Sequence, residues 1–358
     1  MPHLYAAVSG HGFGHLGQLA PVLARLGELL PELRLTLQTT LPEPLLRHRL
    51  GRDFGLVEEA ADFGMLMADA VTVRVADSLA AYRQVHGDWQ RRLQHQRALL
   101  ERHRPDLVLA NIPYLTLAAA QSQGLPSAAL CSLNWADVLQ AYSDDSPPIR
   151  QLLETMRAAY ASAAVFLRPE PSMPMSWLAN GEPIGPVASL GTPRREAMRA
   201  ALGVSSASRV VMVNLGGMPG ELPIGRWSGG DVHWLVPSEW RLKAPRVYAW
   251  EASGLEFLDT LASCDALITK PGYGMIVEAT CLGLPIAWVP RGIWPEVPYL
   301  MPWAEHRGRV TELASEALPP GGLLPVLEAL WARPAPPPPE PSGVEAAARR
   351  LAGLLSAD

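Results

Sequence analysis

Short apolar runs alternate with segments of helical periodicity along most of the chain. The run LYAAVS (4–9) ends in glycines, and the next segment, LGQLAPVLARLGELL, places its apolar residues at helical spacing. Another apolar run, LRLTLQTT, occupies 33–40. The order of strand, glycine-rich loop, helix and strand predicts the start of a doubly wound α/β domain. Further strands are predicted at 106–112, 127–133 and 163–169, with a helix over 114–124.

The same alternation restarts after a passage rich in proline, residues 169–193, where regular structure is expected to break. Strands are then predicted at 209–217, 246–250, 265–274 and 284–290, with a helix after the glycines at 272–274. The segment ARPAPPPPEPSG predicts a polyproline-like tether before a last amphipathic helix. We therefore expect an α/β protein with two Rossmann-like domains facing each other across a cleft. The expected parts are an N-terminal domain (1–168), a linker (169–193), a C-terminal domain (194–340) and a C-terminal helix (341–358).

Composition narrows the class of protein. The chain has 358 residues, more than one compact core usually holds, and it is 48% hydrophobic and 18% charged. Its net charge of −5, with no basic stripe, argues against a nucleic-acid partner. The three cysteines have no metal-ligand spacing and are expected to be buried and reduced. Without a basic leader or an apolar run of the ~18 residues that a bilayer span needs, a cytoplasmic location is expected.

Glycine turns follow three of the predicted strands, at Gly10–Gly14, Gly216–Gly217 and Gly272–Gly274. Such a turn lets backbone N–H groups approach an anion, and the helix behind it adds its positive end. A single loop of this kind can equally well be an ordinary turn between a strand and a helix. Three loops over two successive α/β halves favour a ligand at the carboxyl ends of the strands. The first loop lacks the acidic residue of a dinucleotide fingerprint, and no P-loop is present.

The third loop opens the segment TKPGYGMIVEATCLGLPIAWVPR (269–291). Glu278 falls just inside the predicted helix, where its carboxylate can accept hydrogen bonds from both hydroxyls of a ribose. An acidic residue favoured early in a helix explains it equally well.

This segment resembles the donor-binding segment of GT-B glycosyltransferases, in which a glycine turn, a helix carrying Glu and a G-x-P lead into a strand. The chain is most similar to the glycosyltransferase-like N-terminal domain of plant L-arabinokinases and its stand-alone bacterial relatives. Those also carry a GHGFGH loop (10–15 here), a KxGYGxxxEA motif (270–279) and a run that here begins at Arg291 and includes Trp294 and Glu296. The likeness extends from about residue 4 to 305.

The resemblance implies the GT-B fold and a nucleotide-diphosphate sugar, with a uridine donor expected, as co-substrate and no further cofactor. It implies that Glu278 holds the ribose, that Arg291 and Glu296 lie near the phosphates or the sugar, and that Tyr248 and Trp250 face the base. A packed core position explains Trp250 as well. The diphosphate would be lined by Gly12, Gly14, Gly216, Gly217, Gly272, Tyr273 and Gly274.

The chain departs from the family pattern in several places. The kinase half of an arabinokinase is absent, so sugar phosphorylation is not expected. Asn111 stands where an aspartate is usual, and Ala136 and Val138 stand where aromatic residues are usual. These departures concern recognition of the acceptor more than of the donor.

His11 and His15 in the first loop are the candidate catalytic residues. A histidine has an unperturbed pKa near ~6.5 and can take a proton from an acceptor hydroxyl at neutral pH. We assign His15 as the base and His11 as a helper. Two other interpretations remain: a metal site, for which no third ligand is nearby, and imidazoles that only cap the first helix. Asp137, Asp144 and Asp145 either orient an imidazole, bind an acceptor or belong to a solvated loop.

The sequence therefore predicts a metal-independent glycosyltransferase acting on a small-molecule or lipid-linked acceptor. A sugar-nucleotide epimerase or hydrolase of the same fold, and a non-catalytic nucleotide-sugar-binding protein, are the alternatives. The run WVPRGIWPEVPYLMPW (288–303) fits either peripheral contact with a membrane that carries the acceptor or a loop folded under the cleft.

Overall fold

The computed structural model describes residues 1–358 apart from 70, 216–229, 242–243, 314–321 and 357–358. Within the described residues the chain forms two parallel sheets. The first has seven strands in the order β3 (Gly55–Val57), β2 (Arg34–Gln38), β1 (His3–Val8), β4 (Leu107–Asn111), β5 (Ser127–Leu130), β6 (Val165–Pro169) and β7 (Gly181–Ile184). The second has six, in the order β10 (Val247–Ala249), β9 (Val232–Val236), β8 (Arg209–Asn214), β11 (Ala266–Thr269), β12 (Ile286–Trp288) and β13 (Val310–Glu312).

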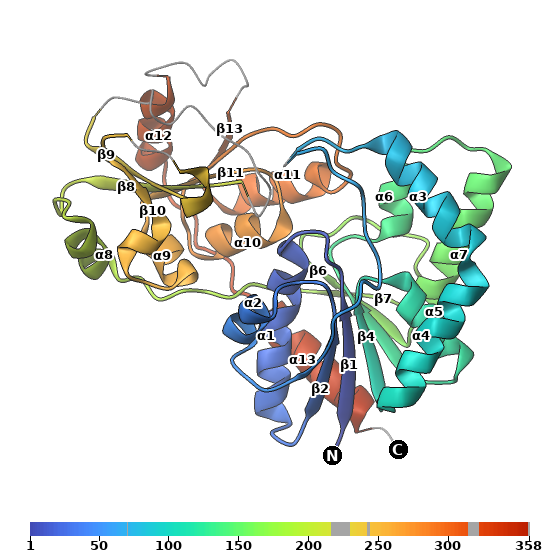
Figure 1. The fold of residues 1–358 in the computed structure, drawn as a ribbon. Helices are drawn as coiled ribbons and strands as arrows, with labels where there is room; N and C mark the ends of the chain where they lie inside the picture. The colour runs from blue at the N-terminus through green and yellow to red at the C-terminus, as the bar shows by residue number, and fades with distance from the viewer. Residues whose placement is uncertain (70, 216–229, 242–243, 314–321, 357–358) are drawn as a thin grey trace.

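Helices cover both faces of each sheet, which explains why the central strands are apolar throughout rather than alternating (Figure 1). All six residues of β1 are buried. In the first domain the helices are α1 (Gly14–Leu29), α2 (Glu43–Leu50), α3 (Val75–Gly87), α4 (Trp89–His103), α5 (Tyr114–Ser122), α6 (Trp135–Gln140) and α7 (Pro147–Ala161). In the second they are α8 (Arg195–Leu202), α9 (Phe257–Ser263), α10 (Tyr273–Cys281), α11 (Val297–Arg307) and α12 (Leu323–Ala332), with short 3-10 turns η2 (Ser238–Trp240) and η3 (Trp250–Ser253).

The predicted α/β class and the strands predicted from continuous apolar runs are confirmed. Within the described residues, four strands form where no strand was predicted: β3, β7, β9 and β13. The predicted linker also needs a correction, because residues 181–184 within it form β7 at the edge of the first sheet. Pro183 is tolerated there because an edge strand has one side without ladder hydrogen bonds. The boundaries at 168, 193 and 340 stay predictions.

The last helix, α13 (Gly343–Leu355), returns to the first domain and packs beside α1, so that both termini lie at the same end of the molecule (Figure 1). Ala347, Ala348 and Leu351 of α13 are buried in the core cluster around α1. Arg25 of α1 also pairs with Glu345 at 2.5 Å. The chain thus crosses between the domains twice.

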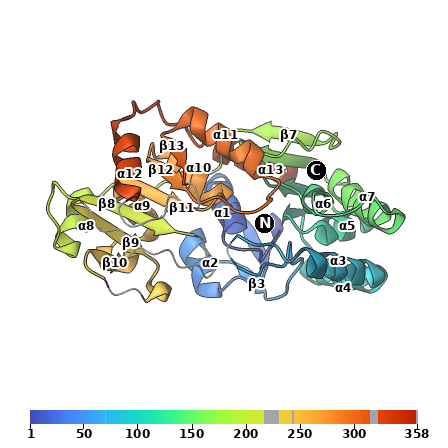
Figure 2. The same ribbon diagram turned by 90° about the horizontal axis from the view of Figure 1, so that it is seen from above.

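The carboxyl ends of the two sheets meet between the domains. The loop after β1 leads into α1, the loop after β11 leads into α10, and these two helices start side by side (Figures 1 and 2). A Cβ on Gly274 would lie 3.8 Å from Cα of Gly14. Ligands of open α/β sheets bind at this end of the strands, so the contact between the helix starts marks the place to look for a site.

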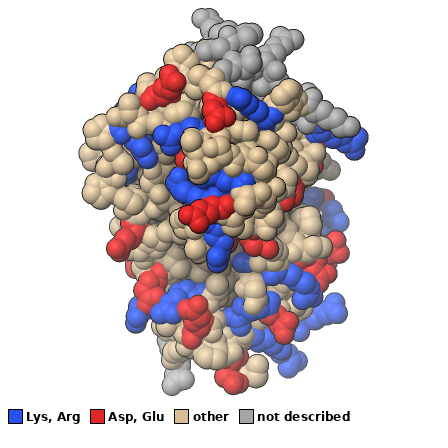
Figure 3. All heavy atoms as spheres, turned by 90° about the vertical axis from the view of Figure 1, so that its left-hand side faces the viewer, with Lys and Arg blue, Asp and Glu red and all other residues tan. Residues whose placement is uncertain are grey.

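Basic and acidic side chains are interspersed on the face of the molecule shown in Figure 3. Among the helices of the described residues, none combines the length and the apolar character that crossing a bilayer requires. The three cysteines are buried and unpaired, as expected.

Candidate functional site

His15 lies in the first turn of α1 and is held by Asn111 at the end of β4. The imidazole Nδ1 is 2.7 Å from Oδ1 of Asn111, whose amide nitrogen donates to Oε1 of Gln18. With that amide orientation Oδ1 can only accept, so Nδ1 of His15 carries the proton. Nε2 is then the basic nitrogen. Burial lowers the pKa of His15 to about 4, which keeps the ring neutral at pH 7.

A chain of hydrogen bonds connects this pair to the second domain. Gln18 donates to the Ser132 hydroxyl at 2.8 Å, and Ser132 donates to Oε1 of Glu296 at 2.6 Å. Burial raises the pKa of Glu296, and the bond from Ser132 opposes that shift. The structure therefore brings Glu296 and His15, both predicted site residues, into one network across the domain boundary.

His11 is enclosed by aromatic side chains. Its ring stacks on Trp294 with centroids 5.8 Å apart and is tilted against Trp135 at 5.2 Å. Its Nε2 is buried and has no hydrogen-bond partner among the described residues. Burial and the positive charges of Arg291 and Lys270 lower the pKa of His11 to about 3. The same Trp135 also lies 5.5 Å from His15, so one indole separates the two imidazoles.

Two cations of the second domain lie close enough to His11 for their charges to lower its pKa. Arg291 lies with Cζ 4.1 Å above the ring of Trp294, and its Nη1 is 3.5 Å from the carbonyl of Pro271. Lys270 directly follows β11 in the turn that starts α10. Burial and the charge of Arg291 lower the pKa of Lys270 to about 8. Bringing two half-buried cations close together costs electrostatic free energy, and a bound anion would offset that cost.

We call His11, His15, Asn111, Lys270 and Arg291 the interdomain cluster. The N-termini of α1 and α10 add backbone N–H groups with which the cluster can bind an anion. Gly14 is the first residue of α1, and Gly272 immediately precedes α10. Gly12 has φ +77°, a conformation that favours glycine. Gly216 and Gly217, also predicted to line a diphosphate, lie outside the described residues.

The side chain of Tyr273 does not join the cluster. Its hydroxyl donates to the carbonyl of Glu170 at 2.9 Å and accepts from the backbone N–H of Val187 at 3.1 Å. The hydroxyl therefore anchors α10 to the connection between the domains, and the predicted place of Tyr273 at the diphosphate would fall to its backbone. The backbone N–H at the start of α10 remains for an anion.

Glu278 lies on α10 and is only 4% exposed. Burial raises the pKa of its carboxyl to about 7, and the charge of Arg49 on α2 opposes the shift. Arg49 also lies 5.8 Å from the centre of the Phe257 ring, which meets Trp250 edge-on at 5.3 Å. The predicted ribose residue and one predicted base-facing residue are therefore linked through two side chains.

Tyr248, the other predicted base-facing residue, stacks on His233 with centroids 5.8 Å apart. The carboxylate of Asp137 accepts hydrogen bonds from the amide of Asn134 and from the indole of Trp177. Within the described residues, it forms no hydrogen bond with either imidazole of the interdomain cluster. Asp144 and Asp145 are exposed, as the solvated-loop interpretation predicts.

Sequence reasoning missed Asp62. It accepts hydrogen bonds from Ser9 Oγ and from the indole of Trp135, each at 2.7 Å, and burial raises its pKa to about 6. Asp62 thereby fixes the indole that separates the two histidines. Lys270 was also missed as a site residue, although it lies in the quoted KxGYGxxxEA motif. Within the described residues, no three or more His, Cys, Asp or Glu side chains are positioned to share a metal ion.

Comparison with solved structures identifies the fold. A glycosyltransferase of kitacinnamycin superposes with a TM-score of 0.65 at 18% identity, covering 99% of this chain and 94% of that chain. UGT89C1 of Arabidopsis thaliana gives 0.64 at 13% identity, covering 99% and 100%. The glycosyltransferase VinC in complex with DTDP gives 0.59 at 20% identity, covering 99% and 95%. The fold is GT-B. At these identities the likeness concerns the fold alone.

No family model matches the chain. Among curated proteins, the L-arabinokinase of Arabidopsis thaliana is 23% identical over 341 residues, which cover 90% of this chain. The aligned part spans 31% of the length of that relative. The match agrees with the resemblance found in the GHGFGH and KxGYGxxxEA motifs.

Proposed function

We propose that this GT-B protein transfers a sugar from a nucleotide-diphosphate sugar to the hydroxyl of a small or lipid-linked acceptor. The observation that carries the proposal is the composition of the interdomain cluster. A neutral His15 with a defined tautomer contacts the same indole, that of Trp135, as His11 does. Lys270 and Arg291 lie close enough to His11 for their charges to lower its pKa. A neutral base from the first domain and two cations from the second suit a reaction in which one reactant loses a proton and negative charge develops on the other. The solved structures that share this fold and are named as glycosyltransferases support the same reaction class.

In the proposed step the acceptor oxygen attacks the anomeric carbon and a new C–O bond forms. The bond between that carbon and the diphosphate oxygen breaks, and the electron pair leaves with the diphosphate. Nε2 of His15 takes the acceptor's proton as the oxygen becomes acidic in the transition state. A base on one side and a leaving group on the other favour inversion at the anomeric carbon.

The charge on the departing diphosphate is met by Lys270, Arg291 and the N-terminus of α10. Oriented backbone N–H groups and buried cations stabilise developing charge without reorganisation. The proposal therefore needs no metal.

The donor is proposed to place its ribose against Glu278 and its base near Trp250, with uridine as the nucleoside. Glu278 is buried, so the side chains around it must move before a ribose can reach its carboxylate. Related solved structures are described with DTDP or thymidine diphosphate. Deoxythymidine lacks the 2′-hydroxyl and carries a 5-methyl group, so comparing UDP with dUDP, which differ only in that hydroxyl, tests whether Glu278 binds it.

Calorimetric titration of UDP, dUDP, dTDP, GDP and ADP tests the donor site. We expect micromolar binding of UDP, weakened about tenfold or more in Glu278→Ala, because a hydrogen bond to a charged group contributes roughly 1.5–3 kcal/mol. Glu256→Ala, which removes an exposed carboxylate paired with His48, is the matched control and should bind like the wild type. If none of the five nucleotides binds, the proposed donor site is wrong.

A non-catalytic nucleotide-sugar-binding protein is the second candidate, and Asn111 favours it. The hydrogen bond to the neutral amide raises the pKa of His15, but the amide lacks the negative charge with which a carboxylate would raise it further. If UDP binds and no UDP is released from UDP-sugars with any acceptor class, including water, this second function replaces the first.

A further inference from the structure

The second domain has a cavity at the end of its sheet opposite the interdomain cluster. It measures about 220 Å³. Its lining residues include Arg209, the first residue of β8, Asp265, which directly precedes β11, and Arg309, which directly precedes β13. All three mark the amino ends of parallel strands. The length of the strands therefore separates this cavity from the carboxyl ends where the proposed transfer takes place.

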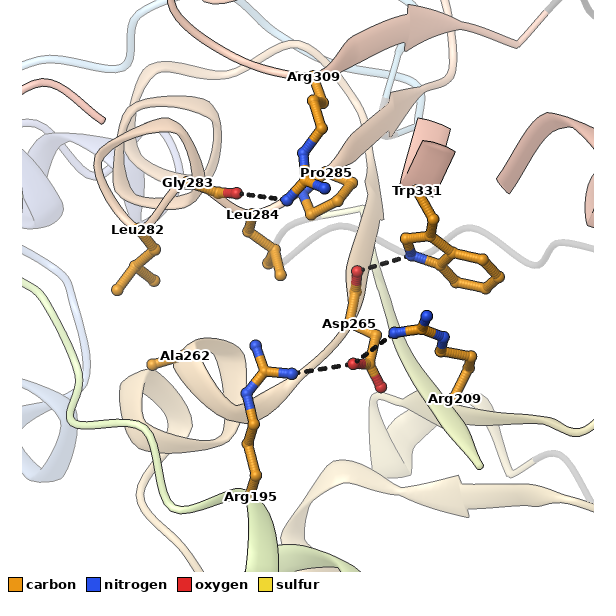
Figure 4. A pocket seen from close by; sticks show the side chains of 10 residues that line it. All are labelled: Arg195, Arg209, Ala262, Asp265, Leu282, Gly283, Leu284, Pro285, Arg309 and Trp331. Atoms are coloured by element: carbon orange, nitrogen blue, oxygen red, sulfur yellow. Dashed lines mark hydrogen bonds and ion pairs between the residues drawn. The ribbon is translucent and has the colours of Figure 1, made fainter. Parts of the chain in front are cut away.

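The charges around the cavity are arranged about one carboxylate. Arg195 and Arg209 reach Oδ1 of Asp265 at 2.9 and 3.4 Å (Figure 4). Arg199, which is not among the lining residues, reaches Oδ2 at 2.9 Å. Asp265 also accepts the backbone N–H of Val210 at 2.8 Å. A buried carboxylate with this many donors holds the guanidinium groups in fixed positions.

Arg309 enters from another side and makes no bond to that carboxylate (Figure 4). It donates to the carbonyl of Gly283 at 3.1 Å, and its Nε is buried with no hydrogen-bond partner among the described residues. Desolvation and the charge of Arg209 lower the pKa of Arg309. Asp265 is the one carboxylate among the lining residues, so they carry an excess of two positive charges.

An aromatic wall completes the cavity. The indole of Trp331 on α12 donates to the carbonyl of Asp265 at 2.9 Å, and Arg209 lies with Cζ 4.9 Å from the centre of its ring. A purely structural ion-pair network would balance its charges, whereas this one leaves donors and positive charge facing an open space. Drug-sized ligands occupy pockets of about 300–1,000 Å³, so the occupant of this smaller cavity is compact.

We propose that this arginine cavity is a second, anion-binding site that takes a phosphate group, as inorganic phosphate or as the phosphate of a small monoester. Guanidinium groups match the geometry of phosphate oxygens and remain charged at all physiological pH values. The bound group would accept hydrogen bonds from the guanidinium groups that line the cavity and offset the repulsion between Arg309 and Arg209. The site is independent of the proposed transfer reaction.

Calorimetry with the full chain tests the proposal, with inorganic phosphate, glucose 1-phosphate and glucose as titrants at matched ionic strength. We expect saturable binding of a phosphate-bearing titrant and none of glucose. Binding of inorganic phosphate alone identifies the free ion as the ligand, and tighter binding of glucose 1-phosphate identifies a monoester. No saturable binding of either would overturn the proposal.

Variants locate the binding. Arg309→Gln leaves the Asp265 network in place and should weaken phosphate binding at least tenfold. Arg307→Gln removes an exposed arginine two residues away, paired with Glu170 at 3.7 Å, and should change nothing. Arg291→Gln should also leave this binding intact, because Arg291 belongs to the interdomain cluster. Loss in Arg291→Gln but not in Arg309→Gln would assign the phosphate to the interdomain cluster and contradict the second site.

A fluorescence measurement covers the case in which Arg309→Gln does not fold. Phosphate should change the tryptophan emission of the wild type through Trp331, and the change should disappear in Trp331→Phe. A change of equal size in Trp331→Phe would contradict the assignment.

Discussion

The two walls of the interdomain cluster differ in how they deal with charge. The wall from the first domain is neutral: His11 and His15 have lowered pKa values, and Asn111 is an amide. The wall from the second domain carries Lys270 and Arg291 close together. One wall is suited to accept a proton from a neutral hydroxyl, and the other to hold an anion. Each domain thus supplies one half of the proposed chemistry, and neither half is sufficient alone.

Removing the proposed base tests the first wall and has the largest expected effect. In His15→Gln the rate of sugar transfer should fall about 10²–10⁴-fold, the usual contribution of general-base catalysis. UDP affinity should change less than threefold, because donor binding relies on the opposite wall. The measurement is UDP release from a UDP-sugar with acceptor present, beside calorimetry of UDP. An exposed histidine, changed in His95→Gln, serves as the control. Full activity in His15→Gln would assign the base elsewhere.

Removing a cation tests the second wall. Arg291→Gln should weaken UDP binding about 10–100-fold, since a charge-assisted hydrogen bond contributes roughly 1.5–3 kcal/mol. The pH dependence of activity should keep its shape because His15 is untouched. Arg307→Gln is the control for loss of an arginine. Unchanged UDP affinity in Arg291→Gln would show that the diphosphate does not lie against this wall.

Introducing a charge into the neutral wall sharpens the comparison. The base form of His15 exists above its pKa of about 4, so the acid limb of kcat/KM against pH should lie well below pH 6 in the wild type. In Asn111→Asp a carboxylate faces Nδ1 and favours the protonated ring, which raises that pKa. The acid limb should move up by one pH unit or more. An acid limb that does not move would mean that another group controls it.

The smallest effect on UDP binding is expected at Tyr273, a predicted site residue whose hydroxyl bonds the backbone of the interdomain connection. Tyr273→Phe removes the hydroxyl that bonds Val187 and Glu170, so the free energy of unfolding should drop by about 1–3 kcal/mol. UDP affinity should stay within threefold. Tyr299→Phe, at a residue that is 41% exposed, should leave stability unchanged. Denaturant unfolding measures both variants, and a large loss of UDP affinity in Tyr273→Phe would restore its predicted role at the diphosphate.

Sequence patterns predicted the strands that are buried on both faces, since their apolar runs are continuous. They failed for β7, which contains Pro183, and for β3 and β13, which have three residues each and no readable pattern. In these elements pairing with neighbouring strands decides the structure, and local sequence does not encode it. β9 was missed although its five residues are buried.

The candidate site shows the same limit. His11, His15, Arg291 and Glu296 were predicted because they lie in motifs that resemble a family. Asp62 was missed because its partner Trp135 is 73 residues away, and no local pattern connects the two. Asn111 was noticed only as a departure from the family, and its contact with His15 spans 96 residues. Tyr273 lies within a motif, yet a distant hydrogen bond sets its orientation.

A crystal structure of the protein with UDP tests the central claim most directly. We predict that the diphosphate lies within hydrogen-bond distance of Lys270 and Arg291 at the start of α10, with Nε2 of His15 on the opposite side of the site. A diphosphate bound away from these two cations, or a His15 ring turned away from it, would contradict the division of the cluster into a proton-accepting wall and an anion-holding wall.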